Sequence, residues 1–253
     1  MSKILTRRKL VTTGLAAVAG AAGLRAAAVL ADRYGLIPPD HGGIYGVGET
    51  LTYAAQRLLT SHHSLAREFP RSQISKVIPV NGDPPRREGY QRLLAGGFRD
   101  WRLTVDGLVA RPASFSLADL RSYPPRTQIT HQACEEGWSF IAEWTGVPLS
   151  YVLSLAGVRP QARYVVFFAF DDSWDSLDMP DAWHPQTLLA YGMNGADLPA
   201  PHGAPVRVRV ARQLGYKSVK YLSRITVTDS LKDIGKGLGS MAPEVGYSWY
   251  AGI

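Results

Sequence analysis

The residues best suited to chemistry form one short run, His131-Gln132-Ala133-Cys134-Glu135-Glu136-Gly137-Trp138. Cys134 is the only cysteine among 253 residues, so it has no partner for an internal disulfide. A lone cysteine is commonly just a small buried apolar residue. Here, however, two carboxylates, a glycine and a tryptophan follow it, which is more typical of the rim of a pocket. A thiolate at such a rim could be a metal ligand or a nucleophile.

Two further polar stretches follow predicted strands and contain cations, at residues 202–207 and 214–220. Taken singly, each fits an exposed loop or strand. Taken together with the thiolate, His202, Arg207 and Lys220 would suit an anionic, phosphate-bearing cofactor with a metal. Arginine offers a two-pronged donor to phosphate, and the backbone N–H groups of a Gly/Ser turn add further donors.

The elements that must position these residues are short. Alternating or continuous apolar runs predict strands at residues 101–109, 126–132, 163–170, 205–210 and 221–228. Helices are predicted at residues 49–59, 116–120, 150–156 and 184–190, and a polar loop at 171–180. In the first of these helices Thr50 is the expected N-cap, and Leu51, Ala55, Leu58 and Leu59 share one face. Short strands mixed with short helices and many Pro and Gly turns predict an α+β fold.

The composition describes an ordinary globular protein, with 45% hydrophobic and 19% charged residues. The net charge of +7 comes largely from the first 31 residues, which hold five basic residues and no acid. The rest of the chain has 23 basic and 21 acidic residues. This balance does not support a basic surface for nucleic acid, and no nucleic-acid partner is predicted.

The first residues have the pattern of an export signal. Thr6-Arg7-Arg8-Lys9-Leu10-Val11 precedes a weakly apolar, Ala/Gly-rich stretch, and together they resemble a bacterial twin-arginine signal. The alternative is a short basic N-terminus before an ordinary helix. Arg25 interrupts the apolar stretch, and the cleavage sites after Ala28 and Ala31 are imperfect. We therefore expect a periplasmic protein whose leader is either removed or kept as a membrane anchor.

The chain is expected to divide into three parts. Residues 1–31 would be the export signal or anchor, and residues 32–97 an irregular extension packed on the core. Residues 98–253 would form one catalytic domain. Within the extension, Asn81-Gly82 is a strong turn signal, and His62-His63 is predicted to lie in a solvated loop.

Seven elements follow one another in the order known from one family. They are the twin-arginine leader, Val105-Asp106-Gly107-Leu108-Val109, Cys134-x-Glu136-x-Trp138, Trp144-x-Gly146-x-Pro148-Leu149, His184-Pro185, Gly203-Ala204-Pro205-x-Arg207 and Gly215-x-Lys217-x-x-Lys220. In this order of motifs the chain resembles the sulfite-oxidase-type molybdopterin oxidoreductases. It is most similar to their exported bacterial branch, which includes the periplasmic methionine sulfoxide reductases. The resemblance covers roughly residues 81–229 and implies that family's mixed-sheet fold in a single domain.

The resemblance also implies a cofactor, molybdenum–molybdopterin. The sequence leaves open whether the pterin carries an added nucleotide, and the short Lys/Arg turn with no extra binding region favours the form without one. Cys134 would be the catalytic residue and the metal ligand, beside the two dithiolene sulfurs, a role that suits a soft thiolate. The remaining residues implied to bind the cofactor are His202 and Arg207, the turn Ser218-Val219-Lys220, and two pterin-side polar residues, Asp172 and Asn81.

The substrate implied by the resemblance depends on the residues after Cys134. The sulfite oxidases that the chain resembles have the pattern Cys-x-x-x-Arg-Arg after the ligand cysteine. At the positions of the two arginines this chain has Trp138 and Ser139. A two-electron oxo transfer that reduces a sulfoxide or another neutral oxo-acceptor is therefore expected, and sulfite oxidation on the same cofactor is the alternative. Because the chain has no haem motif, electrons would come from a membrane haem or quinone-linked subunit, with this chain as a monomeric catalytic subunit.

Two other classes of function stay open from the residues alone. One is a cofactor-free cysteine hydrolase, in which His131 or His202 would activate Cys134. The other is a periplasmic binding or assembly protein on the same fold without the cofactor.

Overall fold

The computed structural model describes residues 23, 25–60 and 64–253. The twin-arginine pattern and His62-His63 lie outside these residues. None of the described helices is long and apolar enough to cross a membrane.

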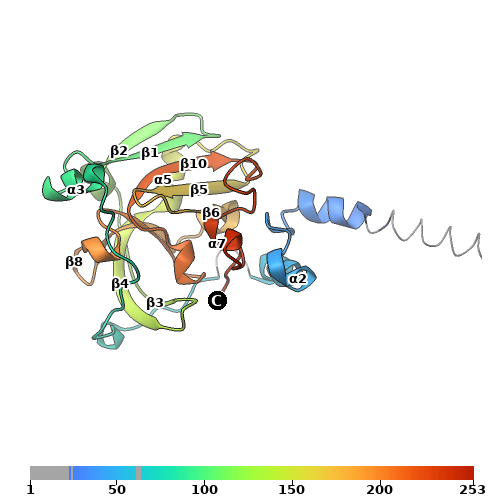
Figure 1. Ribbon diagram of the computed structural model, residues 1–253, viewed down its shortest axis with the longest axis horizontal. Coiled ribbons are helices and arrows are strands. Elements are labelled where there is room, and N and C mark those ends of the chain that lie inside the picture. Colours follow the sequence, from blue (N-terminus) through green and yellow to red (C-terminus); the bar gives the residue numbers. More distant parts are fainter. Residues whose placement is uncertain (1–22, 24, 61–63) are drawn as a thin grey trace, which may run out of the picture.

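The first of two sheets has the strand order β2-β1-β10-β5-β6 (Figure 1). Its strands are β1 (Arg102–Gly107), β2 (Ala113–Ser116), β5 (Tyr164–Ala169), β6 (Trp174–Asp178) and β10 (Leu222–Thr228). β1 and β10 run parallel, and every other pair of neighbours is antiparallel. The sheet is therefore mixed.

The second sheet carries the polar residues of interest. Its main path is β3-β4-β7-β8, and β9 also pairs with β7. Its strands are β3 (Arg126–Ala133), β4 (Ser139–Pro148), β7 (Thr187–Met193), β8 (Ala196–Asp197) and β9 (Arg207–Val210). All of its pairs are antiparallel. β3 ends just before Cys134, and β9 begins at Arg207, so this sheet fixes both residues.

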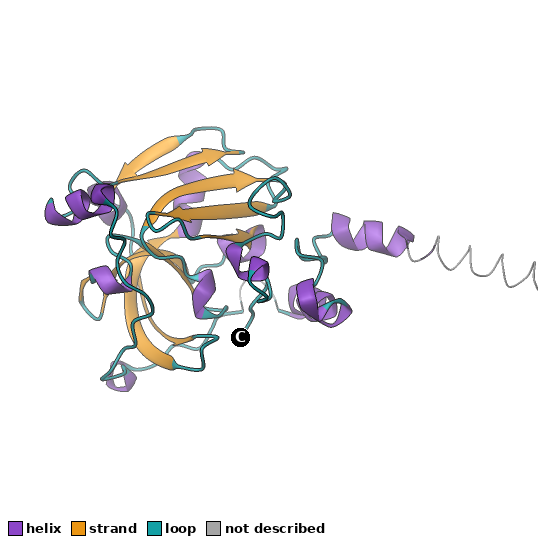
Figure 2. Ribbon diagram, in the orientation of Figure 1, coloured by secondary structure: helices purple, strands orange, loops and turns teal. Residues whose placement is uncertain are grey.

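The main core lies between the two sheets (Figure 2). Val105 of β1, Phe167 of β5 and Val208 of β9 belong to one buried cluster, together with residues of helix α5 (Leu149–Ala156). The α+β prediction is confirmed: a single core joins strands from both ends of the chain.

The remaining helices are short and lie around the sheets. They are α2 (Val47–Leu59), α3 (Glu88–Ala95), α4 (Leu117–Ser122), α6 (Met179–Ala182) and α7 (Met241–Glu244), with 3-10 turns η1 (Gly43–Tyr45), η2 (Arg71–Gln73), η3 (Ala200–His202) and η4 (Gly215–Lys217). Residues 25–33 are also helical. The predicted helix at 49–59 is confirmed within α2, although Gly46, not Thr50, is its N-cap.

The five predicted strands and three of the four predicted helices are confirmed, and the errors are instructive. Residues 184–190 were expected to be helical, but Thr187–Met193 form β7. Every residue of β7 is buried between β4 and β9, and this pairing overrides local helix propensity. The expected loop at 171–180 contains β6, whose buried Asp175 and Asp178 made it look like a polar loop.

Candidate functional site

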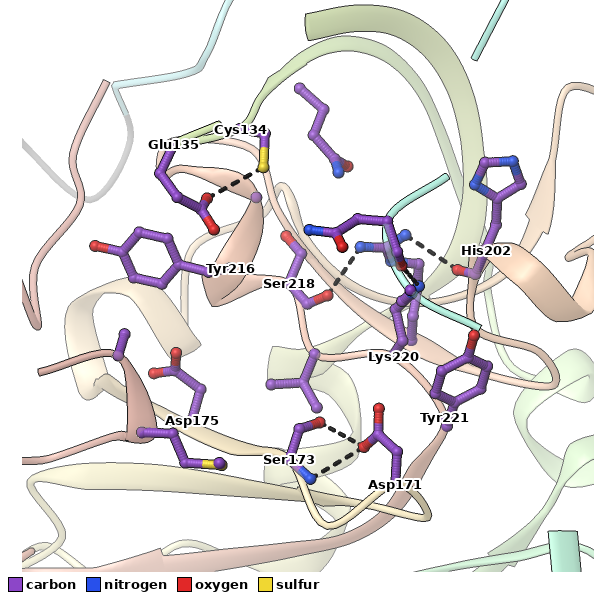
Figure 3. A pocket seen from close by; sticks show the side chains of 18 of the residues that line it. Cys134, Glu135, Asp171, Ser173, Asp175, His202, Tyr216, Ser218, Lys220 and Tyr221 are labelled. Carbon is purple, nitrogen blue, oxygen red and sulfur yellow. Dashed lines mark hydrogen bonds between the residues drawn. The ribbon is translucent and has the colours of Figure 1, made fainter. Parts of the chain in front are cut away.

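A cavity of about 440 Å³ opens where the end of β3, the start of β9 and the turn η4 meet. Seven of the eight residues predicted to bind the cofactor line it: Asn81, Cys134, His202, Arg207, Ser218, Val219 and Lys220. Figure 3 shows two sides. Cys134, Glu135 and Tyr216 lie on one side, and His202, Lys220 and Tyr221 lie on the other. The fold thus brings together residues that are up to 139 positions apart.

Cys134 is held by a tight turn at the end of β3. Its backbone N–H donates to the carbonyl of Trp138 at 2.9 Å, and Gly137, at φ 91°, donates to the Cys134 carbonyl at 3.1 Å. A positive φ of this size favours glycine, which explains the Gly in this motif. The thiol donates to Glu135 Oε2 at 3.2 Å, and Trp138 Nε1 donates to Glu136 at 2.8 Å.

The surroundings of Cys134 do not favour a free nucleophilic thiolate. Burial, with the nearby charges of Glu135 and Glu136, raises the pKa of the thiol to about 11. His131 lies on the other face of β3, since side chains alternate along a strand. His202 lines the cavity but is not a hydrogen-bond partner of the thiol. The cysteine-hydrolase alternative therefore lacks its base.

Arg207 is the buried cation of the cavity. Its guanidinium donates to the carbonyls of His202 at 3.0 Å and of Ser218 at 2.8 Å. Among the described residues no carboxylate forms an ion pair with it. Burial lowers its pKa to about 10. A buried cation without an acid is costly, so this position is suited to an anionic ligand.

A second buried arginine lies behind the first. Arg207 and Arg209 both stack on Trp144, with Cζ at 5.1 and 5.6 Å from the ring centroid. Arg209 is fully buried and donates to Thr130 and to the His131 carbonyl, and its Nε has no partner. Burial and the charge of Arg207 lower its pKa to about 9. The two cations therefore reinforce the positive potential behind the cavity.

The same side of the cavity carries Lys220 and His202. Lys220 Nζ donates to the carbonyls of Asn81 at 2.5 Å and of Pro201 at 3.1 Å, which ties the Asn81 turn to the cavity. Burial and the charge of Arg207 lower the pKa of Lys220 to about 8. Burial, with the charges of Arg207 and Lys220, lowers that of His202 to about 4, so His202 is neutral at neutral pH.

The turn η4 packs directly on the strand that ends at Cys134. A Cβ at Gly215 would lie 3.3 Å from the Ala133 carbonyl oxygen, so only glycine fits without a shift. Lys217, two residues on, does not line the cavity. It is buried, pairs with Asp175, and lies 4.9 Å from the Trp249 ring. Within the Gly-x-Lys-x-x-Lys motif, the first lysine is structural and the second faces the cavity.

The structure corrects one predicted residue, Asp172. Its side chain is exposed and pairs with Arg87, and it does not line the cavity. Asp172 occupies a turn at φ 65°, and its neighbours Asp171 and Ser173 face the cavity instead. The structure thus places the predicted residue outside the cavity and both of its neighbours at it, because sequence cannot show which residue of a tight turn points inward.

Sequence reasoning also missed cavity residues. Gln132 lines the cavity, is 4% exposed, and its Oε1 has no hydrogen-bond partner. It lies two residues before Cys134 on the same face of β3, so strand alternation was a signal that could have identified it. Met241, Ala242 and Val245 come from the C-terminal region, and they had no motif to indicate them.

The residues present fit a molybdopterin cofactor. A thiol, a soft ligand for molybdenum, lies on one side of the cavity. Arg207 and Lys220, neither paired with an acid among the described residues, lie on the other and are suited to a phosphate. The unpartnered Oε1 of Gln132 offers an acceptor to a ligand N–H group.

Comparisons with known proteins agree with this geometry. Residues 94–233 match the family described as the oxidoreductase molybdopterin binding domain. The chain is 38% identical over 200 residues to a protein of Azospira oryzae provisionally named protein-methionine-sulfoxide reductase subunit YedZ1, covering 78% of this chain and 71% of that one. It is 34% identical over 163 residues to the protein-methionine-sulfoxide reductase catalytic subunit MsrP of Ralstonia nicotianae, covering 58% of this chain and 48% of that one.

A solved structure extends the match to three dimensions. The sulfane dehydrogenase SoxCD from Paracoccus pantotrophus is similar with a TM-score of 0.50 and 28% identity, over 52% of this chain and 39% of that one. The family match covers more than half of the chain and includes Cys134, Arg207 and Lys220. This chain belongs to the family of oxidoreductases with a molybdopterin-binding domain.

Proposed function

We propose that this oxidoreductase reduces a sulfoxide or a similar neutral oxo-acceptor. The observation that carries the proposal is the separation of charge across the cavity. Lys220 and His202 are on the side opposite Cys134, and Arg207 donates to the His202 carbonyl, whereas Glu135 and Tyr216 lie on the side of the thiol. A sulfite dianion would meet an acid beside the metal ligand, so a neutral sulfoxide fits this side better.

The protein's own residues have distinct tasks in this proposal. Cys134 would hold the metal, and Arg207, Lys220 and the 218–220 turn would hold the phosphate and pterin. The cofactor supplies two-electron oxo transfer. Reduction of a sulfoxide to a sulfide consumes two electrons and two protons and releases water. Two carboxyl groups are within reach of the Cys134 thiol, Glu135 at 3.2 Å and Glu136 at 4.0 Å. Glu135 is the nearer one and is placed to hold a proton at Oε2.

Turnover by cofactor-loaded protein tests the proposal. With a reduced dye as electron donor, small sulfoxides and methionine sulfoxide should be reduced. With an oxidised dye as electron acceptor, sulfite should be oxidised at least about tenfold less efficiently in kcat/KM, a barrier difference of about 1.4 kcal/mol. Cys134→Ser should abolish the reaction. A preference for sulfite would favour the sulfite-oxidase alternative, and loaded protein active on neither would contradict the proposal.

We further propose that the chain is exported to the periplasm and receives its electrons from a membrane subunit. The support is the twin-arginine pattern at Arg7-Arg8 and the naming of its relatives as subunits of reductases. Changing both arginines to lysine should leave the protein in the cytoplasmic fraction of cells, while the unchanged chain is found in the periplasmic or membrane fraction. Equal distribution of the two would contradict the export.

A further inference from the structure

Helix α2 has the reverse of the arrangement usual for a surface helix, because its charged residues face inward and its large apolar residues face outward. Its two charged residues, Glu49 and Arg57, both face inward. Its outward large side chains are apolar: Val47 is 74% exposed, Leu51 64%, Leu58 70% and Leu59 84%. Thr52 is also exposed, and its hydroxyl donates to the Gly48 carbonyl within the helix. Surface helices normally place their apolar stripe on the core and their charges in water. The apolar face identified in the sequence is therefore present, but the fold leaves it uncovered.

A buried network fixes this orientation. Arg57 pairs with Asp178 through Nε at 2.8 Å and with Asp181 through a terminal nitrogen at 2.6 Å. Tyr53 donates to Asp178 at 2.8 Å, and Tyr250 donates to Gln56 at 3.2 Å. Rolling the helix to bury its leucines would remove the Arg57 cation from Asp178 and would leave Asp181 with Arg212 alone. The apolar face is thus held outward by interactions that are costly to break.

The uncovered face extends beyond the helix. Ile44 and Tyr45 of η1 are 72% and 59% exposed, and only Gly46 separates Tyr45 from Val47. We call Ile44, Tyr45, Val47, Leu51, Leu58 and Leu59 the outer apolar face. Within the described part of the chain, ten of the nineteen exposed large apolar side chains lie between residues 29 and 65. An apolar surface this concentrated marks an interaction site.

The chain that precedes this face indicates what covers it. The Ala/Gly-rich stretch of the leader continues to residue 31, and Val29, Leu30 and Tyr34 are exposed. In Figure 1 the 25–33 helix and α2 lie on the same side of the sheets. Thirteen residues lie between Arg33 and Val47, so the two positions can be at most about 50 Å apart. An anchored or membrane-associated leader would keep the outer apolar face close to the bilayer.

The chemistry of the face also favours lipid over a protein partner. It is chiefly aliphatic, no charged side chain of α2 reaches its surface, and Arg25 and Arg33 lie on the approach to it. Cores of protein interfaces are enriched in Trp, Tyr, Met and Arg, whereas an interfacial helix needs only an apolar face directed into the headgroup region. We propose that the outer apolar face inserts into the surface of a lipid bilayer. The inference concerns a surface outside the cavity and is independent of the redox reaction.

A fluorescent probe tests insertion directly. Leu58→Cys and, as the control, the exposed Val77→Cys would be labelled in the full-length holoprotein with an environment-sensitive dye, and the parent chain with its buried Cys134 would measure background labelling. With phosphatidylethanolamine/phosphatidylglycerol vesicles (3:1), the dye at position 58 should shift to the blue and be quenched by doxyl lipids. The dye at position 77 should not respond, although both chains carry the same leader.

Two outcomes would overturn the proposal. One is an equal response at positions 58 and 77, which would mean that the leader alone binds the vesicles. The other is a concentration-dependent shift at position 58 without lipid, which would mean that a second copy covers the face.

A second pair of variants keeps the test independent of labelling. Leu51→Ser/Leu58→Ser should lower the vesicle partition coefficient at least about tenfold, because two exposed leucines no longer enter the bilayer. Tyr151→Ser/Leu155→Ser on α5, also at exposed apolar positions, should leave the coefficient unchanged. Turnover with a soluble dye should stay the same in the first pair. Unchanged partition in the Leu51/Leu58 variant would contradict the proposal.

Discussion

The buried arginines discussed above are of two kinds: Arg207 and Arg209 have no acidic partner among the described residues, whereas Arg57 is paired with two acids. Arg207 lines the cavity and Arg209 lies behind it, both without an acidic partner among the described residues, and burial lowers their pKa values to about 10 and about 9. Arg57 is nearly as buried, but there Asp178 and Asp181 outweigh burial and raise its pKa. The comparison teaches that burial alone does not identify a ligand-binding cation. A missing counter-charge does so where the cation also lines a cavity, as Arg207 does, since an unpaired buried charge there can be matched by an anionic ligand.

The largest expected effect is the loss of cofactor on replacing Arg207, the arginine of the cavity that has no acidic partner among the described residues. Arg207→Met should lower the molybdenum and pterin content at least about tenfold, because a charge-assisted hydrogen bond to phosphate contributes about 1.5–3 kcal/mol. Content would be measured by elemental analysis and pterin fluorescence on purified protein. Lys220→Met should act in the same direction without disturbing the carbonyls that Arg207 holds. Full molybdenum and pterin content in both variants would show that these two cations do not hold the cofactor.

Replacing the acid-paired Arg57 should lower the stability of the fold and leave the cofactor content unchanged. Arg57→Met leaves Asp178 and Asp181 buried with one cation fewer, so the free energy of unfolding should fall by about 3–5 kcal/mol. Urea denaturation measures this change. The control, Arg92→Met, removes the exposed pair with Glu88 and should cost less than about 1 kcal/mol. Equal losses in the two variants would show that the buried pair is no more important than the exposed one.

Acid should weaken the same region through His184. Its Nε2–H donates to the Ser64 carbonyl and its Nδ1 accepts from Gln186 N–H, so the fold holds the neutral ring. Burial and the charge of Arg212 lower its pKa from 6.5 to about 4. Between these values the unfolded chain binds a proton that the folded chain does not, so stability falls as pH falls from 6.5 to 4, by up to about 3 kcal/mol.

The check on this prediction is a pH series of urea denaturation curves. His202, whose pKa is also lowered, contributes with the same sign, so the informative quantity is the difference between the unchanged chain and His184→Gln. The variant should lose part of the slope between pH 6.5 and 4. An identical slope in both proteins would exclude His184 as the source.

The smallest effect is expected at Asp172. Asp172→Asn removes an exposed ion pair with Arg87 outside the cavity, so stability should change by no more than about 0.5 kcal/mol and cofactor content should not change. A clear loss of cofactor would show that Asp172 reaches the cofactor after all, contrary to its position in this structure.

Much of the site could be predicted from the sequence because motifs fix local chemistry. Cys134, Arg207 and Lys220 each carry a side chain whose type limits what it can bind, and all three line one cavity. What could not be predicted depends on distant contacts. β7 is a strand only because β4 and β9 pair with it, and Lys217 is structural only because Asp175 lies opposite it.

The direction in which the apolar stripe of α2 faces could not be predicted from the sequence either. The apolar stripe of α2 was correctly identified, but patterns normally place such a stripe on the core. The outward orientation follows from the pairing of Arg57 with Asp178 and Asp181, residues more than 120 positions away. The missed residues Gln132 and Asp171 illustrate the same limit at the scale of single side chains.

The central claim is that the unpaired cations and the thiol of this cavity hold one molybdopterin cofactor. The most direct test is the molybdenum and pterin content of the chain purified from a host that makes the cofactor. The account predicts close to one molybdenum and one pterin per chain, with molybdenum lost in Cys134→Ser. Folded protein that contains neither molybdenum nor pterin would contradict the account.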